Sequence, residues 1–186
     1  MRSLRWARRA GMVALLLGLL GPAEARATVM VELPRAELVQ TADLVVRCVV
    51  GAQTVRWNED QSRILTLSRL TVQAYLKGRG PSELVLRQFG GTLDGLTLTV
   101  PGDGHLSPGQ EVVLFLRQGA GVVYLTAMAQ SVYLVTQGVV RRDLHDVSFA
   151  APGPRGGLVP VEPPQEADET LRHLEEAVAY YVRGRR

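Results

Sequence analysis

The stretch that decides the fold is a β-strand pattern, Leu44-Val45-Val46-Arg47-Cys48-Val49-Val50-Gly51. Alternate residues of a strand point to opposite faces, so the residues at even positions share one face and those at odd positions share the other. The face that carries Arg47 is predicted to point outward, which turns Cys48 inward among aliphatic side chains. A buried Cys behaves as a small, inert hydrophobic residue. The alternative is a reactive or intermolecular thiol, because Cys48 is the only Cys of the chain.

This strand is predicted to begin a long hairpin. It continues to Trp57, turns at residues 58–61 and returns as residues 64–76, whose apolar positions are odd at first and even from Leu70 onward. One extra residue near Ser68-Arg69, a β-bulge, would bring both sets to one face and bend the strand. Small closed barrels need such bent strands. Pro34, which is favoured in the first turn of a helix, predicts a short helix over residues 34–42.

The rest of the chain extends this barrel. Residues 83–89 form a third strand, and residues 92–110 are predicted to be irregular because they are rich in turn residues. Residues 111–116 are apolar on both faces, which indicates a central strand covered on both sides. Further strands and hairpins are predicted over 122–129, 131–135 and 139–142. The fold class is therefore mainly β, a small OB-like antiparallel barrel over residues 28–149.

The C-terminal part has a different composition. Residues 150–165 are rich in Pro and Gly and are predicted to be a flexible connector. Residues 166–182 follow with Leu171, Leu174, Val178 and Tyr181 at helical spacing, which predicts an amphipathic helix. We expect this helix to pack on its own barrel, with docking onto a partner as the alternative.

The N-terminal residues 1–27 have the layout of a signal peptide. A basic head is followed by an uncharged run of 11 residues, Ala10 to Leu20, and by small residues at Ala23, Ala25 and Ala27. A membrane-spanning helix needs about 20 apolar residues. Cleavage after Ala25 or Ala27 is therefore predicted, with no stable membrane anchor and a final location in the periplasm or outside the cell.

Removal of this leader changes the charge. Residues 1–27 contain five of the 21 basic side chains and one of the 18 acidic side chains. The remaining chain has 16 basic and 17 acidic side chains, so its net charge is −1. Non-specific binding to nucleic acid needs a large excess of Lys and Arg, so nucleic acid is not an expected partner. The remaining chain is of a usual size for one domain, and we expect a monomer.

The chain resembles a known family. Residues 36–47, which include Ala42-Asp43-Leu44-Val45, and the later Leu76-Lys77-Gly78 resemble the start of the netrin-like domain in tissue inhibitors of metalloproteinases. The resemblance covers about residues 36–130 and implies a five-stranded OB barrel with helices packed on it. A closer likeness, to uncharacterised exported bacterial proteins, rests on Lys77-Gly78, Gly90-Gly91 and residues 108–116, and it implies no activity.

The family's inhibitory chemistry does not transfer. Those inhibitors begin with a Cys whose free amine and carbonyl chelate the protease's zinc. Here the predicted mature chain begins near Arg26 or Thr28, where there is no Cys. The resemblance therefore implies the barrel alone.

No residue pattern points to catalysis or to a cofactor. His105, His145 and His173 are isolated in sequence and lack the spacing of metal sites. The serines sit in no Gly-x-Ser-x-Gly turn. Ca²⁺ binding by Asp94 and Asp103 lacks a supporting Asp/Asn ladder. We therefore expect a protein that is not an enzyme and carries no metal or other cofactor.

The expected function is that of an exported binding module for an unidentified protein. Long loops often carry binding sites, and OB barrels bind on one sheet face and its adjoining loops. The candidate surface therefore comprises Trp57, Tyr75, Phe89, Asp94, Asp103 and His105. The alternative is that the aromatic residues in this set only fill the barrel or pack on its flank. The alternative function is inhibition of a secreted protease by a loop rather than by a terminal Cys, and a hydrolase is a more remote third.

Overall fold

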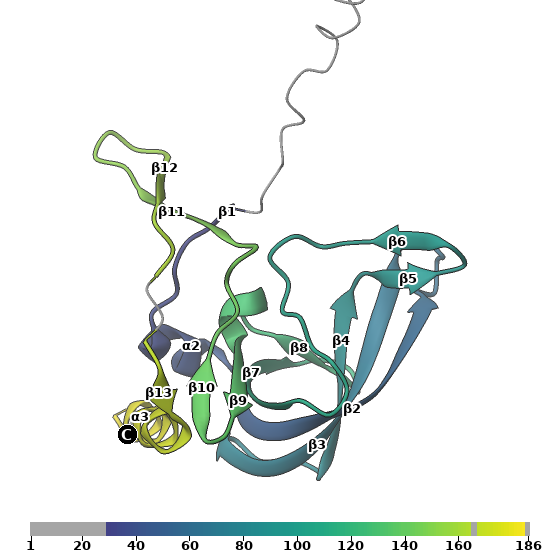
Figure 1. Cartoon of the computed structure of the whole chain (residues 1–186), viewed down its shortest axis with the longest axis horizontal. Helices are drawn as coiled ribbons and strands as arrows, with labels where there is room; N and C mark the ends of the chain where they lie inside the picture. The colour runs from purple at the N-terminus through teal and green to yellow at the C-terminus, as the bar shows by residue number, and fades with distance from the viewer. Residues whose placement is uncertain (1–28, 165–166, 185–186) are drawn as a thin grey trace, which may run out of the picture.

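The structure, a computed structural model, describes residues 29–164 and 167–184, and its centre is a closed barrel of five strands (Figure 1). These strands are β2 (Leu44–Trp57), β3 (Ile64–Lys77), β4 (Glu83–Phe89), β7 (Glu111–Gln118) and β8 (Val123–Leu125). The ring runs β7-β2-β3-β4-β8 and closes because β8 pairs with both β4 and β7. The predicted fold class is thus confirmed, and the barrel is consistent with an OB-like fold.

The interior of the barrel contains the side chains that the strand pattern turns inward. Leu44, Val46, Cys48 and Val50 of β2 belong to one buried cluster with alternate residues of β4 and β7. The prediction for Cys48 is confirmed, because its side chain is fully buried. Burial raises the pKa of the Cys48 thiol to about 12, so the group stays protonated and unreactive at neutral pH.

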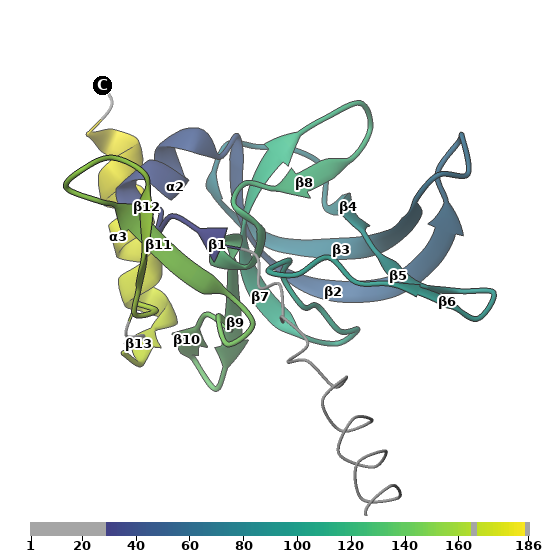
Figure 2. The same cartoon turned by 90° about the horizontal axis from the view of Figure 1, so that it is seen from above.

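A second apolar layer lies between the sheet and two helices, α2 (Arg35–Thr41) and α3 (Leu171–Arg183) (Figure 2). Val113 and Phe115 of β7 pack here, while their neighbours in sequence point into the barrel. The prediction that residues 111–116 are covered on both faces is confirmed. The odd-numbered face of β2 is less exposed than expected, because Val45 is buried beneath the helices and Arg47 is ion-paired at their edge to Glu111 at 2.8 Å.

The sheet continues beyond β7 on the side of the helices. A short 3₁₀ turn, η1 (Met128–Ser131), leads into the hairpin of β9 (Val132–Thr136) and β10 (Val139–Arg141), and β10 pairs with the two-residue strand β13 (Glu169–Thr170). These elements widen the surface on which α3 packs.

A bulge does lie opposite Arg69, close to the predicted Ser68-Arg69, but the prediction that β3 carries the extra residue is wrong. The extra residue sits on the partner strand, where Gly51 and Ala52 of β2 lie between the pairs Val50–Leu70 and Gln53–Ser68. Its site is set by space, because a Cβ at Gly51 would lie 3.2 Å from the carbonyl oxygen of Arg69. Two more register shifts lie nearer the start of β2, and together they bend the hairpin around the barrel.

Two segments predicted to be irregular contain hairpins. Within residues 92–110, β5 (Gly91–Leu93) pairs with β6 (Leu96–Leu98) across Asp94 and Gly95, both at positive φ. Within the predicted connector 150–165, β11 (Ser148–Pro152) pairs with β12 (Leu158–Val161). The C-terminal helix begins at residue 171 rather than 166, because the Thr170 side chain caps it by accepting a hydrogen bond from the His173 amide at 3.2 Å.

The Lys77-Gly78 turn closes the barrel beneath α2. The Lys77 Nζ donates hydrogen bonds to the carbonyl oxygens of Val39, Gln40 and Ala42 at the end of this helix. Gly78 has a φ of 77°, and a Cβ there would lie 2.9 Å from the Asp43 carbonyl oxygen. The residues that carry the family resemblance therefore serve the local structure of the barrel.

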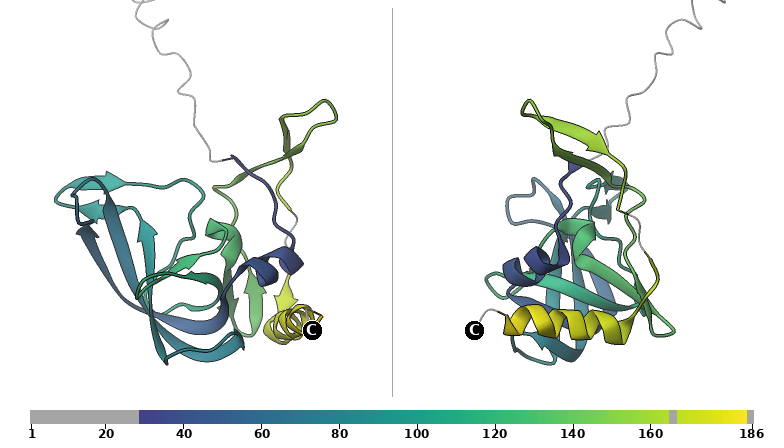
Figure 3. Two further views of the ribbon diagram at one scale, coloured as in Figure 1. Left: turned by 180° about the vertical axis from the view of Figure 1, so that it is seen from behind. Right: turned by 90° about the vertical axis from the view of Figure 1, so that its left-hand side faces the viewer.

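The N-terminal segment of the described chain contacts several segments of its C-terminal half. Strand β1 (Val29–Met30) pairs in parallel with β11 (Figure 3). The buried Gln130 side chain accepts a hydrogen bond from the Leu33 amide and donates one to the Val31 carbonyl oxygen. Arg35 at the start of α2 forms a double hydrogen bond with Glu169 just before α3, at 2.8 and 2.6 Å.

The predicted signal peptide, residues 1–27, lies outside the described residues. Within the described residues, none of the helices combines the length and the apolar character that crossing a bilayer requires.

Candidate functional site

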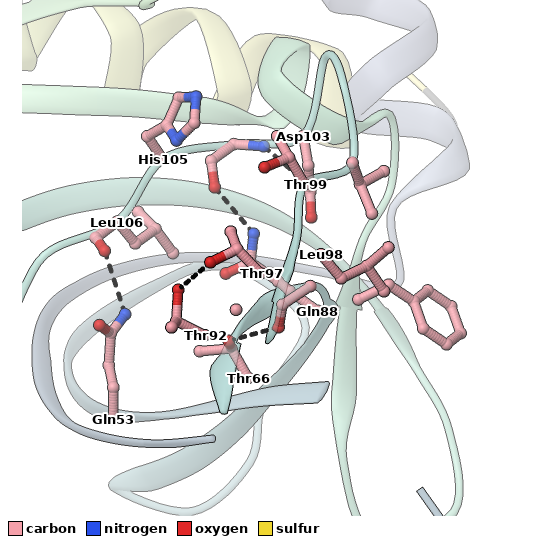
Figure 4. Close-up of a pocket in the computed structure, with 15 residues that line it drawn as sticks. Gln53, Thr66, Gln88, Thr92, Thr97, Leu98, Thr99, Asp103, His105 and Leu106 are labelled. Atoms are coloured by element: carbon pink, nitrogen blue, oxygen red, sulfur yellow. Dashed lines mark hydrogen bonds between the residues drawn. The ribbon is translucent and has the colours of Figure 1, made fainter. Parts of the chain in front are cut away.

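The candidate site is a cleft of about 270 Å³ at the far end of the long β2–β3 hairpin (Figure 4). Its floor is the inner face of β2, β3 and β4, and its wall is the chain from β6 to Leu106. Amide and hydroxyl side chains outnumber apolar ones in the lining. The contributing residues are Gln53, Thr66, Gln88, Phe89, Gly90, Gly91, Thr92, Thr97, Leu98, Thr99, Val100, Asp103, Gly104, His105 and Leu106.

Two adjacent glycines make the close approach of β5 to the barrel possible. Gly91 has a φ of 126°, and a Cβ at this position would lie 2.8 Å from both the Thr66 Oγ1 and a methyl group of Val55. The Thr66 hydroxyl donates a hydrogen bond to the Gly90 carbonyl oxygen at 2.8 Å. The β5–β6 hairpin is therefore held across the end of the sheet, and it forms one wall of the cleft.

Two glutamines hold the opposite wall. The Gln88 Nε2 donates to the Gly104 carbonyl oxygen at 2.8 Å, and the Gln53 Nε2 donates to the Leu106 carbonyl oxygen at 3.0 Å. Figure 4 shows both side chains reaching from the sheet to this loop. Loops fixed by side chains of rigid strands keep their shape on binding, so the cleft is preformed.

Asp103 is the acidic residue of the cleft. Its Oδ1 accepts a hydrogen bond from the Gly104 amide at 2.8 Å. Burial raises the pKa of the Asp103 carboxyl, and the Gly104 and Gln88 hydrogen bonds only partly oppose this effect. The ionised carboxylate is therefore less favourable in the folded chain than in the unfolded one.

We predict that Asp103→Asn stabilises the protein at neutral pH. A raised carboxyl pKa means that the folded state takes up a proton more readily, so acidification toward the folded pKa relieves the cost of the charge. Asn keeps the acceptor for Gly104 and has no charge. Denaturant midpoints should be higher for the variant at pH 7, and the difference should shrink as the pH falls through the raised folded-state pKa toward the ordinary carboxyl value. A variant that is less stable than the parent at pH 7 would contradict the prediction.

His105 points away from Asp103 toward a surface cluster. Its Nε2 lies 3.6 Å from Asp146 Oδ2, and His145 Nε2 lies 3.1 Å from the same atom. His145 also contacts Asp143 through its Nδ1. Hydrogen bonding to Asp143 and the charges of both aspartates raise the pKa of His145. The cluster links the cleft loop to the loop after β10 through pairs that strengthen when the imidazoles are protonated.

We predict that His145 titrates above the ordinary histidine pKa of 6.5. Because the folded pKa is raised, this contribution to stability is present below the unfolded pKa and is lost as the pH rises through the folded value. NMR titration of the ring protons should show the shift, and Asp143→Asn should remove most of it. A His145 pKa at or below 6.5 would contradict the prediction.

The structure brings only part of the predicted surface together. Phe89, Asp103 and His105 line the cleft. Trp57 is half-buried at the end of β2, and Asp94 is exposed at the tip of the β5–β6 hairpin. Tyr75 lies at the other end of β3, where its hydroxyl donates to the Pro81 carbonyl oxygen at 2.8 Å.

Sequence reasoning missed the polar residues that shape the cleft. Gln88 shares the inward parity of Leu84 and Leu86, so its strand position indicated that a polar group enters the barrel mouth. Nothing in the sequence paired it with Gly104.

The described residues show no metal centre. In the ranges 29–164 and 167–184, no three His, Cys, Asp or Glu side chains are placed to hold a metal ion together. The His105–Asp146–His145 cluster is exposed, and its groups pair with one another.

Neither models of known protein families nor curated proteins match this sequence.

Proposed function

We propose that the chain is an exported, non-enzymatic binding module that takes up an extended segment of another protein along β6 and in the adjoining cleft. The observation that carries this proposal is the exposed and unpaired edge of β6 (Leu96–Leu98). All three of its residues are exposed, and it is paired on one edge only, with β5.

An unpaired strand edge is a template for adding a further strand. Leu96 and Leu98 are 57% and 38% exposed, and the neighbouring Phe89 is 40% exposed. Apolar side chains gathered beside a polar cleft are typical of interaction sites. The partner segment would pair its backbone with β6, place apolar side chains against Leu96 and Leu98, and offer hydrogen-bonding groups to the threonines of the cleft.

The netrin-like resemblance is part of this proposal as a scaffold. The structural roles of Asp43, Lys77 and Gly78 support a barrel built in the same way, since Asp43 Oδ2 also accepts a hydrogen bond from the Gln118 amide at 2.8 Å. No residue for zinc chelation transfers with it.

A loop that inhibits a protease is less well supported by the geometry. The tip of the β5–β6 hairpin is a tight turn, because Asp94 and Gly95 have φ values of 51° and 77°. A segment that enters a protease active site as a substrate does must be extended. We therefore expect no inhibition when the mature protein is assayed against a panel of secreted proteases, and saturable inhibition that Leu96→Ser abolishes would favour the inhibitor function instead.

Selection of ligands from a library of random short peptides displayed on phage tests the binding function. Peptides selected on the mature protein should bind the Leu96→Ser/Leu98→Ser variant about tenfold or more weakly, as expected for loss of a central apolar contact. The matched control is Leu158→Ser/Val161→Ser, which removes equally exposed apolar side chains from β12. Peptides that bind both variants like the parent, or that are lost only in the control, would overturn the proposed site.

Export gives a separate prediction. Mass spectrometry of the protein recovered from cells should find an N-terminus at Arg26 or Thr28, as the A-x-A-like sites require. Replacing Ala25 and Ala27 with Leu should block cleavage and leave a larger species. Intact Met1 on cytosolic protein would contradict export.

A further inference from the structure

The outer face of β2, β3, β4 and β8 carries an unusual set of side chains. Residues directly opposite each other on paired strands share a face, and the register places Arg56, Leu65 and Phe89 in one row. The next row holds Thr54, Leu67 and Arg87, and the row after it holds Arg69 and Val85. The cleft lies on the inner side of the same strands, and the two surfaces meet at Phe89 and Asp103, which line the cleft and also a shallower pocket beside Arg87 and Tyr124.

Two aromatic rings and two guanidinium groups stack on this face. The Arg63 and Arg87 guanidinium carbons lie 5.2 and 5.9 Å from the Phe89 ring centroid, and Arg87 lies 5.4 Å from the ring centroid of Tyr124. Arg117 lies opposite Tyr124 on β7. We call the set of Arg56, Arg63, Arg69, Arg87, Phe89, Arg117 and Tyr124 the arginine face.

The arginines of this face lack acidic partners. Within the part of the chain that the structure describes, none of the five forms an ion pair. In contrast, Arg35, Arg47, Arg141 and Arg172 all contact carboxylates. The Arg87 Nε is buried and has no hydrogen-bond partner among the described residues. The nearest acidic residue in the register is Glu83, one row beyond Arg69.

Contact with an aromatic ring holds a guanidinium group in place, and neither Arg63 nor Arg87 forms an ion pair within the described residues. A guanidinium held in this way is preorganised to bind an oxyanion through two parallel hydrogen bonds. Arg56, Arg87 and Arg69 lie on three successive rows but on three different strands, β2, β4 and β3. They therefore form a staggered cluster of positive charge and not a single line.

We infer that the arginine face binds an acidic polypeptide segment, whose carboxylates pair with Arg56, Arg69 and Arg87. The partner is recognised by its negative charge. This inference does not depend on the function proposed for β6, since Leu96 and Leu98 take no part in it and the arginines that carry it do not line the cleft.

The test measures binding of a peptide of alternating Thr and Glu to the mature protein, with a peptide of alternating Thr and Gln as the uncharged control. The Glu peptide should bind, the Gln peptide should not, and added salt should weaken the complex because exposed charges are screened. Arg56→Gln/Arg69→Gln should weaken binding about tenfold or more, the effect of losing charge-assisted hydrogen bonds. Both residues are exposed, so this variant should keep the parental fold and circular dichroism.

Arg155→Gln is the matched control, because Arg155 is exposed and lies in the turn between β11 and β12. Arg87→Gln adds a second measure at the stacked position. Equal binding by the parent and Arg56→Gln/Arg69→Gln would overturn the inference. So would tighter binding of an oligothymidylate of equal charge, which would assign the face to nucleic acid.

Discussion

Replacing Phe115 with Ala is expected to lower the free energy of unfolding by about 3–5 kcal/mol, the usual cost of emptying a buried Phe site. Phe115 is fully buried between β7 and the helices, and its ring centroid lies 5.6 Å from that of Tyr133. A domain is stable by about 5–15 kcal/mol in total, so the variant should unfold at a much lower denaturant concentration.

Phe89→Ala is the matched control for this prediction. Phe89 is exposed on β4, and the guanidinium groups of Arg63 and Arg87 lie over its ring, so its loss should cost about 1 kcal/mol or less. Chemical denaturation of the two variants under one condition makes the comparison. Equal costs for Phe115→Ala and Phe89→Ala would mean that the layer beneath the helices does not stabilise the fold as described.

Replacing Lys77 with Met is expected to cost about 2–3 kcal/mol, because the change removes a charged donor from carbonyl groups that have little access to water. The acceptors are the carbonyl oxygens of Val39, Gln40 and Ala42, and both Val39 and Ala42 are buried. A cation at the end of a helix also interacts favourably with its dipole. Amide hydrogen exchange should show α2 opening more often than the barrel strands do.

The nearby Arg79→Met provides the control, since Arg79 is exposed in the turn after Gly78 and its replacement should change stability by about 0.5 kcal/mol or less. Lys77→Arg, which keeps the charge, should recover part of the loss. If Lys77→Met is as stable as the parent, the lysine does not hold α2 on the barrel.

The barrel was predictable because alternation in a strand reports which face is buried. The alternation of residues 44–50 predicted which side chains point into the barrel. Residues 111–116, which are apolar on both faces, predicted the central strand. The place of the bulge was not predictable from β3 alone, because an extra residue on either strand of a pair repairs the same change of parity. Gly51 in β2 was the missing signal, since a Cβ there would make a tight contact of 3.2 Å with the Arg69 carbonyl oxygen.

The site was less predictable. Asp94-Gly95 is a typical turn of a two-residue hairpin, so the β5–β6 hairpin had a signal that its short strands obscured. The arginine face had no signal in the composition, because its arginines are spread over four strands and one turn and because residues 28–186 carry a net charge of −1. A local concentration of charge becomes visible only when the register is known.

The contacts between the N-terminal segment and the C-terminal half affect the order in which parts of the chain can fold. Strand β1 can pair only when β11 is present. The Arg35–Glu169 pair and the apolar layer beneath α2 and α3 likewise form only with residues near the end of the described chain. A chain that still lacks residues 148–178 cannot complete these contacts, although all five barrel strands lie before residue 126. The barrel can therefore close first, and the segment before β2 should gain its final packing only after these later residues are present.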